Sequence, residues 1–102
     1  MMFVNIIESY RDVVAIADKE LIGKNFSEGK RQLDIKESFY KGENSELLSE
    51  KEVKELIKNF SREDATFNIV GKKSIKCAIE EEIISEESIM TVENVPYSLV
   101  LL

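Results

Sequence analysis

The sequence predicts one α+β domain, residues 1–102, in which two helices pack on a mixed, mostly antiparallel sheet of about six strands. β-Rich runs occur in pairs near both ends of the chain, as in hairpins, whereas strand-like and helix-like patterns alternate only in its middle. At 102 residues the chain has the length of a single domain. A domain of this size buries about two thirds of its unfolded surface, so we expect it to fold without a disulfide or a metal.

The N-terminal part of the chain predicts a hairpin followed by a loop. Residues 3–7 and 13–17 are rich in Val, Ile and Ala, and a short polar turn separates them. We expect Asp18 to cap a short helical turn over residues 19–22. Residues 23–29 begin and end with Gly, so we expect them to form a loop.

Residues 31–40 alternate in polarity like a strand that ends at Gly42. On such a strand Leu33, Ile35 and Phe39 share the buried face. The outward face then carries a carboxylate, a cation, a hydroxyl and an aromatic ring in one line, formed by Asp34, Lys36, Ser38 and Tyr40. We expect any recognition surface of the protein to be built around this line.

The segment 48–60 carries the clearest helical signals in the chain. Ser49 and Glu52 have the spacing of a capping box, and apolar residues recur at every third or fourth position after them. The apolar stripe predicts a face that packs on the core. On the solvated side of this helix we expect Glu50 to pair with Lys54.

The last third of the chain predicts a strand, a second helix and a closing hairpin. The strand spans residues 65–70, and the helix runs from residue 73 or 74 to residue 82. Two further strands, 89–92 and 97–102, form the hairpin. Because the last strand is almost wholly apolar, we expect it to be buried on both faces and its deletion to abolish folding.

The net charge of −6 is concentrated in one segment of the chain. Residues 80–93 hold six acids and no base, so the remaining residues hold 14 acids and 14 bases. This acidic segment disfavours a nucleic-acid surface at that edge and leaves the rest of the surface open to one.

The absence of histidine removes the commonest general base and the commonest zinc ligand. Cys77 is the one cysteine, so it has neither a disulfide partner nor a second thiol, and we expect it to be buried as a small apolar residue. We expect no cofactor, no metal site and no catalytic residue. The sequence has neither a run of 18 apolar residues nor a leader pattern, which favours a cytoplasmic protein that does not contact a membrane.

Basic and aromatic residues are interleaved around the predicted strand 31–40, and this combination suits single-stranded RNA. We expect Lys30, Arg31 and Lys36 to contact phosphates and Tyr40 to stack on a base. The alternative is an ordinary solvated strand face, because the outer faces of antiparallel strands usually carry mixed charges.

The step from strand to helix at residues 68–74 has the outline of an anion-binding loop. Gly71 permits a tight turn, the start of a helix offers free N–H groups, and Lys72 and Lys73 add positive charge. The first Gly of a phosphate loop is missing, so a plain capped helix start stays open as the alternative.

Three segments of the sequence form a pattern that contains no catalytic motif. They read Gly-Lys-Arg-Gln-Leu-Asp-Ile-Lys-Glu-Ser-Phe-Tyr-Lys-Gly (29–42), Asp-Ala-Thr-Phe-Asn-Ile-Val-Gly-Lys-Lys-Ser-Ile-Lys-Cys-Ala-Ile (64–79) and Val-Pro-Tyr-Ser-Leu-Val-Leu-Leu (95–102). In this order the segments resemble the archaeal domain of unknown function 424 family. The resemblance implies an archaeal cytoplasmic protein with no assigned activity. Glu82 departs from the family pattern, because a Gly is expected at this helix end.

Three functions stay open on the sequence. The first is a non-enzymatic binding module in translation or RNA metabolism, with RNA or ribosome-associated proteins as partners. The second is a protein-interaction or self-assembly module, such as a homodimer, that pairs through an exposed edge of the predicted strand 31–40 and buries Phe39 and Tyr40. The third is a small enzyme that uses carboxylates or a metal. It ranks last because the sequence has no general base, nucleophile or phosphate loop within a recognisable motif.

Overall fold

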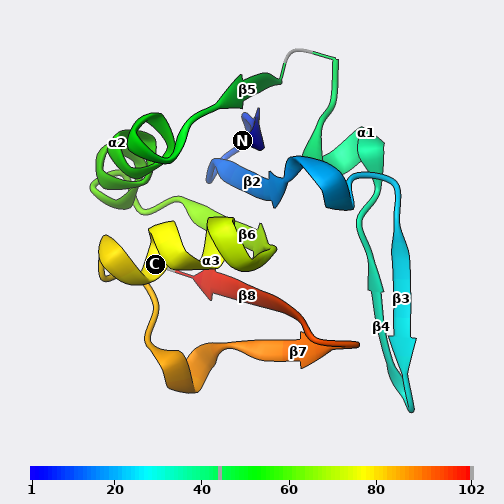
Figure 1. Ribbon diagram of the computed structural model, residues 1–102. Coiled ribbons are helices and arrows are strands. Elements are labelled where there is room, and N and C mark those ends of the chain that lie inside the picture. The colour runs from blue at the N-terminus through cyan, green and yellow to red at the C-terminus, as the bar shows by residue number, and fades with distance from the viewer. Residues whose placement is uncertain (44, 102) are drawn as a thin grey trace.

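The computed structural model describes residues 1–43 and 45–101, which form an α+β domain (Figure 1). Its main sheet has the strand order β5-β1-β2-β6-β8-β7, with β1 (Met2–Ile7), β2 (Val13–Asp18), β5 (Glu46–Leu48), β6 (Thr66–Val70), β7 (Met90–Val92) and β8 (Val95–Leu101). A separate two-stranded sheet consists of β3 (Asn25–Glu28) and β4 (Arg31–Asp34). The helices are α1 (Glu37–Tyr40), α2 (Glu50–Ser61) and α3 (Lys72–Glu80), and the 3-10 turns are η1 (Lys19–Leu21) and η2 (Glu86–Ser88).

The pairing of the strands explains the mixed character of the main sheet. Strands β1 and β2 form an antiparallel hairpin, and so do β7 and β8. Strands β2 and β6 lie side by side and parallel, while β6 pairs with β8 antiparallel. The predicted mixed, mostly antiparallel sheet is therefore confirmed, as are both terminal hairpins. Leu102, the final residue of the predicted last strand, lies outside the described residues. It is also part of the segment whose deletion we expect to abolish folding.

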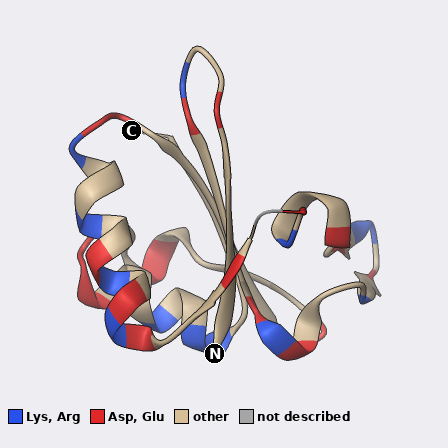
Figure 2. Cartoon of the chain, turned by 90° about the horizontal axis from the view of Figure 1, so that it is seen from above, with Lys and Arg blue, Asp and Glu red and all other residues tan. Residues whose placement is uncertain are grey.

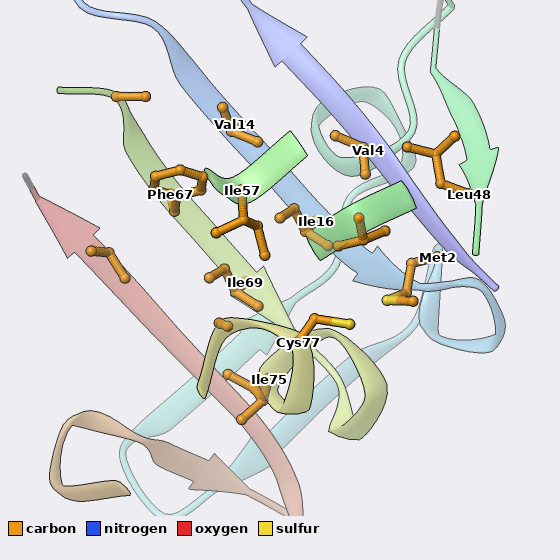
Figure 3. Packing of buried hydrophobic residues seen from close by; sticks show 14 residues of the cluster. Met2, Val4, Val14, Ile16, Leu48, Ile57, Phe67, Ile69, Ile75 and Cys77 are labelled. Carbon is orange, nitrogen blue, oxygen red and sulfur yellow. The ribbon is translucent and has the colours of Figure 1, made fainter. Parts of the chain in front are cut away.

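Helices α2 and α3 cover one face of the main sheet, and α1 lies on the other side (Figure 2). The predicted capping box starts α2: Ser49 Oγ accepts from the backbone N–H of Glu52 at 3.3 Å, and the Glu52 carboxylate accepts from the backbone N–H of Ser49 at 3.0 Å. Between these helices and the sheet lies the larger core cluster, in which Ile57, Phe67 and Cys77 are fully buried (Figure 3). The predicted burial of Cys77 is confirmed.

The opposite face of the sheet is covered at one end only. There the β3–β4 hairpin and α1 enclose a second cluster, which consists of Ala17, Leu33, Ile35, Val70 and Val92. Helix α1 is tied to the sheet because the side-chain amide of Asn5 donates to the carbonyl of Phe39 at 2.6 Å. The hairpin and α1 stop short of the far end of β8, where Leu99 and Leu101 are 55% and 70% exposed.

Several details of the predicted elements were wrong. The predicted strand 31–40 ends at Asp34 and becomes α1 at Glu37, and β3 lies inside the predicted loop 23–29. The exposure of Leu99 and Leu101 shows that the last strand is not buried on both faces. The expected pair of Glu50 with Lys54 does not form, because both side chains reach across to α3. Lys54 bonds Glu80 at 3.0 Å and Glu50 lies 3.9 Å from Lys76.

The end of α3 shows the effect of having Glu at position 82, where the family pattern has Gly. The helix ends at Glu80, and Glu82 adopts a left-handed backbone with a φ of 61°. A Gly adopts this conformation without the Cβ strain that Glu carries, which explains why a Gly is expected there. None of the described helices is both long and apolar enough to cross a membrane.

Candidate functional site

The start of α3 lies beside a small cavity at one end of the main sheet. The cavity has a volume of about 250 Å³ and lies where the carboxyl ends of the parallel strands β2 and β6 meet the turn between β7 and β8. Its wall is formed by Asp18, Glu20, Leu21, Gly71, Lys72, Lys73, Asn94, Val95 and Pro96. Crevices at the carboxyl ends of parallel strands are the usual place for a ligand in sheets of this kind.

The buried carboxylate of Asp18 occupies the N-terminus of α3. It accepts from the backbone N–H of Lys73 at 3.1 Å, from the backbone N–H of Ser74 at 2.8 Å and from the Ser74 hydroxyl at 2.7 Å. Gly71 makes room for this carboxylate, since a Cβ on Gly71 would lie 2.3 Å from the Asp18 Cγ. The expectation that Asp18 caps residues 19–22 was wrong, because its side chain makes no capping bond to η1.

The carboxylate of Asp18 decides between the two readings of residues 68–74. The N–H groups that would bind an anion at a helix start already have a protein acceptor in Asp18. The helix start is therefore capped from within the chain, as the alternative reading expects. Any anion at this site would have to be bound by the side chains of Lys72 and Lys73.

Both lysines are exposed and stand in the first turn of α3. Cations are unfavourable at the positive end of a helix, at a cost of about 0.3–1 kcal/mol each. Lys41, Lys54 and Lys76 have carboxylate partners, whereas neither Lys72 nor Lys73 forms an ion pair with any described residue. The Asp18 carboxylate at the same helix start offsets part of this cost, and the two exposed lysines stay available to an anion.

The hairpin carries Lys30 and Arg31 at its tip, next to the turn between β7 and β8 (Figure 1). Two reciprocal bonds of 2.8 Å fix this contact: Glu93 accepts from the Ser27 N–H, and Glu28 accepts from the Glu93 N–H. The guanidinium of Arg31 donates to the carbonyl of Thr91 at 3.3 Å. Arg31 therefore helps to hold the hairpin on the sheet, while Lys30 is exposed and forms no ion pair among the described residues.

Lys36 precedes the short helix α1 and Tyr40 is its last residue, so the two do not lie on one strand face. Lys36 is exposed at the N-terminus of α1. The ring of Tyr40 packs against the second cluster and meets the ring of Phe39 edge-on at 5.0 Å. Burial raises the pKa of the Tyr40 hydroxyl. The outward line expected from Asp34 to Tyr40 thus does not exist, and the packed ring is poorly placed to stack on a base.

The described residues offer few groups for catalysis. No cluster of three or more Cys, Asp or Glu side chains among them could hold a metal ion. The Cys77 thiol is buried, and desolvation together with the nearby Glu50 carboxylate raises its pKa to about 11, so it is protonated at neutral pH. The arrangement can therefore bind through exposed cations, whereas the Cys77 thiol is not an activated nucleophile.

Sequence reasoning found Lys72 and Lys73 but missed Asp18 as their neighbour. The residues of this cap are separated by 56 positions along the chain, so no local pattern joins them. The one available signal is an Asp at the end of a strand that is otherwise apolar, which predicts a specific partner for a buried charge.

Comparison with known proteins assigns the chain to one family. A family model described as a protein of unknown function (DUF424) matches residues 7–102. The chain belongs to this family. The resemblance that the three segments indicate is thereby confirmed. No curated protein matches the chain, so the DUF424 assignment brings no activity with it.

A solved structure has the same fold. It is that of an uncharacterized conserved protein from Methanopyrus kandleri, with a TM-score of 0.80 and 22% sequence identity. The match covers 98% of this chain and 91% of the other chain. At this identity the likeness supports the fold of the DUF424 protein and says nothing about its ligand.

Proposed function

We propose that this DUF424 protein is a cytoplasmic, non-enzymatic binding module in translation or RNA metabolism. Lys72 and Lys73, at the start of α3, would contact RNA phosphates together with Lys30 and Lys36. The observation that carries the proposal is the pair of adjacent exposed lysines in the first turn of α3, which form no ion pair among the described residues. Exposed lysines are the side chains that supply phosphate contacts in RNA-binding proteins.

The distribution of charge along α3 supports this assignment. Its first turn is basic, and its end runs into the acids Glu80, Glu81 and Glu82. Phosphates would be attracted to the basic end of the helix and repelled from the acidic end, so an RNA strand could approach from one side. Arg31 and Tyr40 have smaller parts in this proposal, because Arg31 bonds the carbonyl of Thr91 and the Tyr40 ring is packed.

Fluorescence polarisation with labelled single-stranded RNA tests the proposal. We expect the Lys72→Glu/Lys73→Glu variant to bind at least tenfold more weakly than the wild-type protein. The matched control is Lys51→Glu/Lys58→Glu, which makes the same charge change on the exposed side of α2. This control should bind almost as well as the wild type.

A salt titration gives a second readout. Each lost phosphate contact should reduce the slope of log K against log salt by about 0.7 for a single strand. Two lost contacts should therefore reduce it by about 1.4 in the α3 variant and leave it unchanged in the α2 control. If both variants lose the same affinity, the attraction is a net-charge effect, and the site assignment is wrong. If the wild type binds neither RNA nor ribosomal particles, the functional proposal is wrong.

A further inference from the structure

The cavity beside the start of α3 has an apolar part of its wall that is open to solvent. This part is formed by Leu21 from η1 and by Val95 and Pro96 from the start of β8, and all three side chains are half-buried. At about 250 Å³ the cavity is smaller than the pockets that hold drug-sized ligands, which measure about 300–1,000 Å³. Its size and its apolar wall therefore suit a single flat ring system, such as one nucleobase.

Two exposed polar side chains, Glu20 and Asn94, lie on the same wall. Neither forms a hydrogen bond or an ion pair with another described residue. The turn that carries Asn94 is held in place, because Val92 pairs with Val95 and Glu93 is bonded to the β3–β4 hairpin. The Glu20 carboxylate is an acceptor only, and the Asn94 amide also offers an acceptor oxygen. The polar part of the wall thus favours a ligand edge that carries N–H donors.

The cations of the cavity come from a different element. Lys72 and Lys73 lie on the wall at the start of α3 and form no ion pair among the described residues. Asp18 also lines the cavity, but its carboxylate is 4% exposed and is directed at α3 by its three bonds to Lys73 and Ser74. The two ammonium groups therefore stay available to phosphates while a ring occupies the cavity.

We propose that this cavity receives one amino-bearing base, adenine or cytosine, of a single-stranded RNA whose neighbouring phosphates contact Lys72 and Lys73. The inference rests on the proposed function and adds a base preference to it. Apolar side chains pack against the faces of a base that leaves its stack, as in other proteins that bind single bases. The exocyclic amino group donates to Glu20 or Asn94. Uracil is disfavoured, because it presents an acceptor oxygen at this position.

Fluorescence polarisation with labelled strands that differ only in their bases tests the inference. The strands carry adenine, uracil, purine (adenine without its amino group) or no base at all. We expect the adenine strand to bind about tenfold more tightly than the purine and uracil strands, as for one well-made contact to a base edge. Because adenine and purine have nearly the same size and both stack, their difference isolates the amino group. The abasic strand should bind through its phosphates alone.

Two variants place the base in the cavity. Val95→Phe narrows the cavity without a change of charge, so it should weaken the adenine strand about fivefold or more and leave the abasic strand unchanged. The matched control is Val13→Phe, at a half-buried Val that begins β2 at the end of this strand far from Asp18. Glu20→Ala should lower the ratio of adenine to purine affinity. Circular dichroism checks folding, and Leu21→Phe replaces Val95→Phe if that variant does not fold.

The outcomes separate this inference from the proposed function. Equal affinity for the adenine, uracil and abasic strands would overturn the inference and leave RNA binding through the lysines in place. So would a Val95→Phe variant that binds the adenine strand like the wild type. A wild type that binds none of the strands would overturn both.

A free nucleotide is the other source of the same chemistry, and adenosine monophosphate tests it. We expect it to bind more weakly than the adenine strand, because it brings only one phosphate to the two lysines. Its binding should be lost in Val95→Phe and kept in Val13→Phe. Binding of the monophosphate as tight as that of the strand would assign the cavity to a free nucleotide and overturn the inference.

Discussion

Replacing Asp18 with Ala should lower the free energy of unfolding by about 3 kcal/mol. The carboxylate accepts three bonds of 2.7–3.1 Å from Lys73 and Ser74 and is 4% exposed. A bond to a charged group contributes about 1.5–3 kcal/mol, and loss of a helix N-cap costs about 0.5–2 kcal/mol. The three bonds share one acceptor residue, so their contributions do not add in full, and about 3 kcal/mol is the expected net loss.

Urea unfolding followed by circular dichroism measures this loss. For a domain of this size the slope is about 1–3 kcal/mol per molar urea, so the midpoint should fall by about 1–3 M with the slope unchanged. Asp34→Ala, at an exposed position of β4, is the matched control and should change the free energy by less than about 0.5 kcal/mol. Ser74→Ala completes a double-mutant cycle, in which we expect a coupling of about 1–2 kcal/mol. A loss no larger than that of the control would refute the reasoning.

Three further predictions concern single side chains. Gly71→Ala should destabilise the protein by more than about 2 kcal/mol, because the alanine Cβ would lie 2.3 Å from the Asp18 Cγ and the backbone has a φ of 107°. The control is Gly29→Ala, whose Cβ would have no atom within 4 Å, and it should cost less in the same urea assay. Glu82→Gly should raise the free energy of unfolding by about 0.5–1 kcal/mol, since Gly removes the strain at a φ of 61°, and an unchanged thermal midpoint would contradict this. Cys77 should react with a thiol reagent only at the rate of opening of the native protein, because the thiol is buried and its pKa is about 11; rapid labelling of the native protein would show that the thiol is accessible.

The parts of the fold that could be predicted are those whose signals are local. The capping box of Ser49 and Glu52 spans four residues, and its geometry is as expected. The β1–β2 hairpin joins neighbouring runs of β-rich sequence and could be predicted for the same reason. In both cases the interacting groups are close in the sequence, so their spacing carries the information.

The parts that could not be predicted depend on distant partners or on very short elements. Helix α1 has four residues, too few to show a helical period, and it is held by Asn5 from β1. The exposure of Leu99 and Leu101 depends on where the hairpin and α1 stop on the sheet, which no run of the sequence records. In the candidate site, Lys72 and Lys73 could be found from their position after Gly71. The carboxylate that fills the helix start could not, because Asp18 lies 56 positions away from Ser74.

The long separation between Asp18 and Ser74 also bears on the order of folding. We expect strand β2 to pair within its own hairpin before it pairs with β6, because the hairpin contacts are local whereas the contact with β6 closes a long loop. We therefore expect the bonds of Asp18 to form after the rate-limiting step. In stopped-flow experiments Asp18→Ala should then speed up unfolding and leave the refolding rate nearly unchanged, which corresponds to a φ-value near zero. The cap on α3 would thus form after the transition state and, by slowing unfolding, set the lifetime of the native state.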